Sequence, residues 1–241
     1  GLLLESKLGV NPFKYGAQAA TDTHTGLATA DEDNFWGKFT GVEPGPERMN
    51  REVTPGLNGW EQASSGYTGA WATANTREAI FDAMERRETF ATTGPRISVR
   101  FFAGFGFTEA DIGAGLVEAG YTRGVPMGGD LKAAPAGKTP TFLVAATKDP
   151  EGANLDRVQI VKGWLGADGK THERIFDVKW SGDRKPDAKG KLPPVGNTVD
   201  LATATYGNSI GVGELVSLWV DPEFDPALRA VYYVRVLEIP T

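Results

Sequence analysis

The sequence predicts an α+β protein in which β structure dominates, and three observations support this. Six runs rich in Val, Ile, Phe, Tyr and Trp follow residue 96, as is typical of strands. Turn-forming connectors such as "DPEGANLD", "LGADGKTH" and "DPEFDP" separate them. The clearest helical pattern, 75–88, lies before residue 96. We therefore expect a β-rich, sandwich-like accessory domain at 97–241 and a smaller helix-containing part at 1–96.

The first part begins with a predicted helix and a predicted strand. Residues 2–8, "LLLESKL", place leucines at helical spacing, and Gly9 can end that helix. The run 13–21 of apolar and small residues predicts a strand buried on both faces that ends at Asp22. The Gly-, Pro- and Trp-containing stretch 34–72 has no regular period, and we interpret it as an ordered long loop that serves as a lid.

The predicted helix 75–88 has clear end signals. Asn75 is a good N-cap with Glu78 at capping-box spacing, and Arg86 and Arg87 fall where the helix dipole favours cations. The strand predictions are 97–103, 141–147, 157–164, 174–180, 215–220 and 230–239. Asp168-Gly169 between two of these runs predicts a hairpin, whereas 108–135 fits either a poor helix or an irregular excursion.

Composition narrows the classes of function. The 241 residues carry 25 Lys and Arg against 31 Asp and Glu, a formal charge of −6, so we expect no nucleic-acid partner. No apolar run reaches the roughly 18 residues of a membrane span. The absence of cysteine excludes disulfides and thiolate metal sites without fixing the compartment.

Asp22 and His24, in "TDTH", are the candidate metal ligands. Residues i and i+2 of a strand point the same way, so a carboxylate and an imidazole would lie together where the predicted strand ends. An ordinary Asp turn with a nearby surface histidine explains the same pattern. Two further motifs each have two interpretations. The acids 31–33 either bind a cation or are merely solvated. Arg96, after Gly-Pro, either contacts an anion or lies in a simple helix-to-strand connector.

Several segments together resemble one family. They are "LGVNPFKYGAQAATDTHTGLATADEDNFWGK", "NTREAIFDAMERRETFATTGPRISVRFF", "GVPMGGDL", "DPEGANLDRVQIVKGW" and "YYVRVLEIPT". The chain resembles, over essentially its whole length, the C-terminal part of a large bacterial family of unknown function related to the polymerase-and-histidinol-phosphatase (PHP) metallohydrolases. That family has a distorted (β/α)7 barrel and up to three divalent metals. Its metal ligands begin with an early His-x-His and end with a late Asp-x-His.

The resemblance implies specific roles. Asp22 and His24 match the late motif, and residues 1–96 would be the C-terminal remnant of the barrel, whose other ligands would lie upstream. The resemblance implies a metal-dependent, phosphoesterase-like hydrolase with zinc, manganese or iron. Its substrate would be a small-molecule ester, and Arg96, or as second choice Lys38, would bind an anionic group. This chain alone would be inactive, and a complementary N-terminal fragment or a homo-oligomer is an expected partner. The resemblance also favours a periplasmic or secreted location.

A different class of function is also open. The region 97–241 can act as a non-catalytic β-sandwich binding or interaction module, in which Trp164, Trp180 or Trp219 stacks on a sugar or a partner. We favour the simpler alternative that these rings fill the sandwich core.

Overall fold

The structure is a computed structural model, and it describes residues 1–26, 38–39, 45–48, 50–62 and 66–241. The chain forms two compact units. The first unit comprises 1–16, 85–88 and 97–241, and the second comprises 17–84 and 89–96. The protein is mostly β with few helices, as the sequence predicts. Residues 1–16 and 85–88 thus group with the β-rich region, although the sequence places them in its first predicted domain. Within the described residues, no helix is long and apolar enough to cross a membrane.

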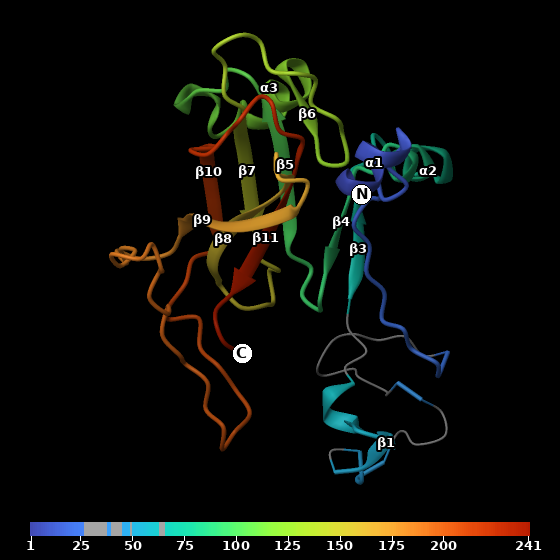
Figure 1. Ribbon diagram of the computed structural model, residues 1–241. Helices are drawn as coiled ribbons and strands as arrows, with labels where there is room; N and C mark the ends of the chain where they lie inside the picture. Colours follow the sequence, from blue (N-terminus) through green and yellow to red (C-terminus); the bar gives the residue numbers. More distant parts are fainter. Residues whose placement is uncertain (27–37, 40–44, 49, 63–65) are drawn as a thin grey trace. The chain divides into compact units, whose positions relative to one another are not determined.

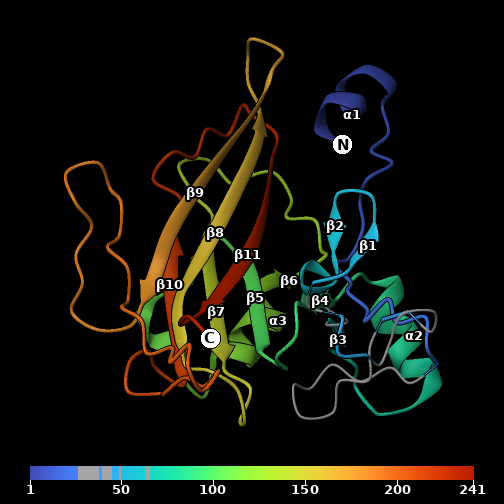
Figure 2. The same cartoon turned by 90° about the horizontal axis from the view of Figure 1, so that it is seen from below.

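Two antiparallel sheets make the first unit, and Figures 1 and 2 show them packed face to face. One sheet has the order β10-β7-β5-β6 and the other β11-β8-β9. The bounds are β5 Ser98–Gly104, β6 Gly124–Pro126, β7 Thr141–Thr147, β8 Leu155–Leu165, β9 Thr171–Trp180, β10 Glu214–Val220 and β11 Ala230–Glu238. All six runs predicted as strands after residue 96 form strands, within a few residues of the predicted bounds. They do so because each run carries the β-branched and aromatic residues that a half-buried pleated surface favours.

Phe142 of β7 joins the two sheets. It is 1% exposed and lies 4.7 Å, centroid to centroid, from the ring of Tyr232 on the opposite sheet. Trp219 of β10 lies 5.4 Å from Phe142 and 5.0 Å from Phe176 of β9. Trp219 is half-buried and packs on rings of both sheets at the edge of the core, which agrees in part with the simpler sequence interpretation.

The predicted hairpin is confirmed. Gly169 has φ +73°, a conformation that glycine adopts without strain, and the amide of Gly166 bonds the carbonyl of Lys170 at 2.8 Å. This turn connects β8 to β9, which are the longest strands of the unit. Their length carries the sheet beyond the point where Phe142 closes the core.

The structure corrects two of the helix predictions. Helix α1, Leu2–Leu8, ends at a left-handed Gly9 as predicted. Helix α3, Leu116–Arg123, shows that part of 108–135, for which the sequence left two interpretations, is helical. Helix α2 spans Arg77–Glu85, and its cap is the Thr76 hydroxyl, which accepts the Ala79 amide at 3.2 Å. The prediction of Asn75 as N-cap is wrong by one residue, since threonine at the next position offers an equivalent oxygen. The predicted end at 88 is also wrong: the helix stops at Glu85, so Arg86 and Arg87 lie beyond its last turn, and Arg87 has φ +63°.

The second unit contains β1 Glu52–Thr54 with β2 Leu57–Asn58, the 3-10 turn Gly59–Glu61, and β3 Tyr67–Ala70 paired with β4 Thr89–Thr92. The predicted strand 13–21 does not form. Its residues lack a backbone ladder, and Tyr15 is 72% exposed rather than buried. Small residues here leave little apolar surface to bury, so the segment is held by side-chain hydrogen bonds instead.

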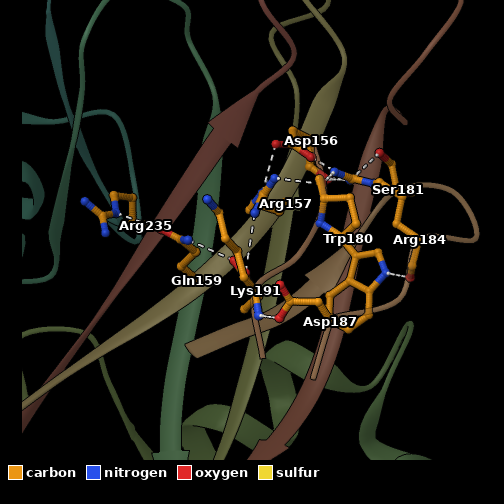
Figure 3. Close-up of polar contacts among 11 residues, drawn as sticks. Asp156, Arg157, Gln159, Trp180, Ser181, Arg184, Asp187, Lys191 and Arg235 are labelled. Atoms are coloured by element: carbon orange, nitrogen blue, oxygen red, sulfur yellow. Dashed lines mark hydrogen bonds and ion pairs between the residues drawn. The ribbon is translucent and has the colours of Figure 1, made fainter. Parts of the chain in front are cut away.

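Arg184 fastens the connection after β9 to the three-stranded sheet (Figure 3). Its guanidinium donates to Asp156 Oδ1 at 2.6 Å and to the Pro193 carbonyl at 3.0 Å. The indole N–H of Trp180 donates to the Arg184 carbonyl at 2.7 Å. Trp180 is therefore part of a structural network rather than a free stacking surface.

Glu238, at the end of β11, gives a testable dependence of stability on pH. Burial raises its pKa to about 7, helped by the charge of Asp149, and its Oε1 has no partner among the described residues. Because the pKa in the folded state lies above the unfolded value of 4.5, stability falls as pH rises from there to about 7. We expect Glu238→Gln to stabilise the protein by about 1–2 kcal/mol near pH 8, allowing for solvent screening of a half-buried group.

Urea unfolding at about pH 5 and pH 8 checks this expectation. The gain should be present at the higher pH and nearly absent at the lower one. Exposed Glu214→Gln serves as the control and should give no such difference. An equal effect of Glu238→Gln at both pH values would contradict the assignment.

Candidate metal centre

The segment that leads to the candidate site is fixed by two threonine hydroxyls. Thr68 Oγ1, on β3, accepts the Ala19 amide at 3.0 Å and donates to the Ala19 carbonyl at 2.7 Å. Thr89 Oγ1, on β4, donates to the Ala17 carbonyl at 2.7 Å. These bonds satisfy backbone groups that a third strand would otherwise pair. They place residues 17–19 beside the antiparallel β3-β4 pair and so position the residues that follow.

Asp22 has an unusual backbone. Its φ is +51°, a left-handed conformation that residues other than glycine adopt rarely and at a cost of about 1–3 kcal/mol. The next residue, Thr23, has a buried hydroxyl oxygen without a hydrogen-bond partner among the described residues. Strained backbone and unsatisfied buried groups are features that concentrate at functional sites.

The Asp22 carboxylate lies between two basic side chains. Its Oδ1 is 3.3 Å from His24 Nε2, and its Oδ2 is 3.0 Å from Lys38 Nζ. The hydrogen bond and charge of Lys38, followed by those of His24, hold the pKa of Asp22 below its usual value. The carboxylate is therefore ionised at neutral pH, which is the form that ligates cations.

His24 and Lys38 are also joined through the backbone. The His24 amide donates to the Lys38 carbonyl at 2.8 Å, and His24 forms a parallel bridge with Phe39. The rings of His24 and Phe39 lie 5.0 Å apart. The side chain of Lys38 is only 14% exposed, whereas Asp22 and His24 are 70% and 57% exposed. Of the three side chains, Lys38 is thus the least accessible, and Asp22 and His24 are open to solvent.

The structure brings together three of the four predicted site residues. Asp22, His24 and Lys38 form the cluster, and the ammonium of Lys38 has the Asp22 carboxylate as a partner. Arg96 is exposed in the turn before β5 and is not among the described groups that shift the pKa of Asp22. The binding of an anionic substrate group by Arg96, or by Lys38, stays a prediction. The acids 31–33 and most of 34–44 in the predicted lid lie outside the described residues.

Additional ligands do not appear among the residues that the structure describes, where no group of three or more His, Cys, Asp or Glu side chains could hold a metal. His172, the other histidine, is distant in sequence and pairs with Asp168, at 3.2 Å. Sequence reasoning missed the threonine hydroxyls of residues 68 and 89. A Thr at the start of a short β run carries no signal for the distant backbone that its hydroxyl will bind.

A family model for proteins of unknown function, DUF3604, matches residues 1–241. The chain belongs to the DUF3604 family. No curated protein and no solved structure matches the chain. The match confirms the sequence expectation of a domain-of-unknown-function family, and it covers both units of this DUF3604 protein.

Proposed function

We propose that this DUF3604 protein supplies Asp22 and His24 to a divalent-metal centre of a PHP-type hydrolase. The observation that carries the proposal is the pairing of an ionised carboxylate with an imidazole at 3.3 Å, next to a backbone held at φ +51°. The resemblance of "TDTH" to the late Asp-x-His motif of PHP enzymes agrees with it. In this proposal residues 1–96 belong to the barrel and 97–241 form an accessory domain.

The geometry of the pair fits metal ligation. A tetrahedral zinc with bonds of about 2.0–2.1 Å separates its ligand atoms by roughly 3.3 Å, and Asp22 Oδ1 and His24 Nε2 lie at this distance. Both side chains are exposed enough to admit an ion. Because catalytic zinc takes at least three protein ligands, further ligands have to come from residues other than those described.

A bound divalent ion would supply activated water and polarise an ester oxygen. The chain's own residues prepare that chemistry. Lys38 lowers the pKa of Asp22 and holds its Oδ2, while Oδ1 lies 3.3 Å from His24 Nε2. Arg96 provides a guanidinium suited to an anionic ester group. Phosphoesters are the substrate class that the resemblance to PHP enzymes favours.

Metal titration tests the proposal with a matched control inside the same chain. Asp168 and His172 form a second exposed Asp-His pair, at 3.2 Å, that lacks the strained backbone and the lysine partner. We expect Zn²⁺ or Mn²⁺ to bind weakly to the chain in equilibrium dialysis. Asp22→Ala or His24→Ala should reduce the affinity at least tenfold, and His172→Ala should leave it unchanged.

Two results would overturn the proposal. One is the absence of any metal binding to the chain at millimolar metal concentrations. The other is an equal loss of binding in His172→Ala and His24→Ala, since that would describe non-specific binding by exposed histidines.

A further inference from the structure

A small pocket lies at the end of the sandwich where β8 and β11 extend past the core. Its volume is about 260 Å³, below the roughly 300–1,000 Å³ of pockets for drug-sized ligands. The residues that line it are Lys162, Trp164, Glu223, Phe224, Asp225, Leu228, Ala230 and Tyr232. They come from two strands and from the connection between β10 and β11, so the whole pocket belongs to the first unit.

A buried charged network forms one side of the pocket. Lys162 is 5% exposed, and its ammonium donates to Asp221 Oδ2 at 2.6 Å and to the Glu223 carbonyl at 2.7 Å. The hydroxyl of Tyr232 donates to the same Asp221 oxygen at 2.6 Å. Since an ammonium has three N–H bonds, one remains for a ligand in the pocket that Lys162 lines.

Aromatic rings form the walls. Trp164 is braced by His172, whose ring stacks on it at 5.3 Å with an interplanar angle of 19°. Tyr232 is fixed by its bond to Asp221 and by its contact with Phe142. Burial and the Asp221 carboxylate raise the pKa of Tyr232 far above its usual value, which keeps it a neutral phenol. Braced rings lose little entropy when a ligand stacks on them.

Carboxylates stand at the rim. Glu223 and Asp225 are exposed, and Glu223 forms an ion pair with Arg174. Asp225 Oδ1 accepts the Ala227 amide at 2.8 Å, a bond that fixes the turn. Carboxylate oxygens at such positions can accept hydrogen bonds from hydroxyl groups.

Two of the three charged side chains that line the pocket already have ion-pair partners, because Lys162 lies against Asp221 and Glu223 lies against Arg174. A charged ligand would therefore lose hydration without reaching an unpaired buried counter-charge. A neutral ligand with hydroxyl groups and an apolar C–H face satisfies the ammonium, the carboxylates and the rings together. We propose that this pocket binds one neutral sugar residue, which stacks on an aromatic wall and hydrogen-bonds Lys162 and the rim carboxylates.

The test uses the intact chain and defined probes. Neutral methyl glucoside, galactoside and mannoside are compared with anionic glucuronate and cationic glucosamine, by saturation-transfer NMR and tryptophan fluorescence. We expect at least one neutral glycoside to bind with millimolar affinity and the charged sugars to bind at least tenfold more weakly. Trp164→Ala should weaken the binding at least tenfold.

Two further variants locate the binding. Leu228→Trp replaces a lining residue by a larger one that fills the pocket and should abolish binding, which keeps the test valid if Trp164→Ala does not fold. Tyr233→Ala removes a half-exposed aromatic from the opposite face of β11 and should leave binding unchanged. Absence of neutral-sugar binding at about 50 mM, preference for a charged sugar, or unchanged binding in Leu228→Trp would overturn the proposal. None of these results bears on the metal centre of the second unit.

Discussion

Asp221→Ala is expected to destabilise the protein by about 3–5 kcal/mol, because it leaves the ammonium of Lys162 buried without its counter-charge. Both side chains are nearly inaccessible, at 6% exposure for Lys162 and 0% for Asp221. The substitution also removes the acceptor of the Tyr232 hydroxyl and the cap of the Glu223 amide. Chemical denaturation followed by tryptophan fluorescence measures the loss.

A double variant separates the uncompensated charge from the lost packing. Lys162→Met with Asp221→Ala removes both charges, and we expect it to recover a large part of the lost stability. Asp225→Ala is the matched control, since this aspartate lies in the same connection but is exposed and caps a single amide. Its cost should stay near 1 kcal/mol or below. A loss for Asp221→Ala no larger than that of the control would contradict the importance of the buried pair.

Phe142→Ala should also cost about 3–5 kcal/mol, the range for removing a buried aromatic side chain. Its ring contacts Phe101 at 5.6 Å on its own sheet and Tyr232 at 4.7 Å on the other. Alanine would leave a cavity between two sheets that are each held by continuous hydrogen-bond ladders and cannot collapse into it.

The comparison for Phe142→Ala is Tyr233→Ala. Tyr233 is 50% exposed on β11, and its removal should change the free energy of unfolding by less than about 1 kcal/mol. Urea midpoints and slopes for both variants distinguish a lost core contact from an altered unfolded state. Similar effects of the two substitutions would show that Phe142 does not join the sheets as described.

The proposed sites depend on the fold in different ways. Asp22 and His24 are two residues apart, so a local motif brings them within 3.3 Å even though the predicted strand before them does not form. Lys38 is brought to the same carboxylate by the isolated β-bridge between His24 and Phe39. No periodic pattern in the sequence predicts that bridge. The proposed sugar pocket could not be predicted from the sequence. Its lining combines Trp164 of β8 with Asp225 and Leu228, which lie in a connection some sixty residues later.

The sequence by itself determined the mostly β fold, the strands after residue 96, the hairpin at Asp168-Gly169 and the pairing of Asp22 with His24. These follow from side-chain alternation, β-branched content and turn residues, which act over a few neighbouring positions. Only the tertiary structure decided that Thr68 and Thr89 replace a backbone ladder for residues 17–19, that Lys38 pairs with Asp22, and that Lys162 is buried against Asp221. The reason is physical: each of these contacts satisfies a polar group that burial has separated from water, and its partner is set by which distant segments pack together.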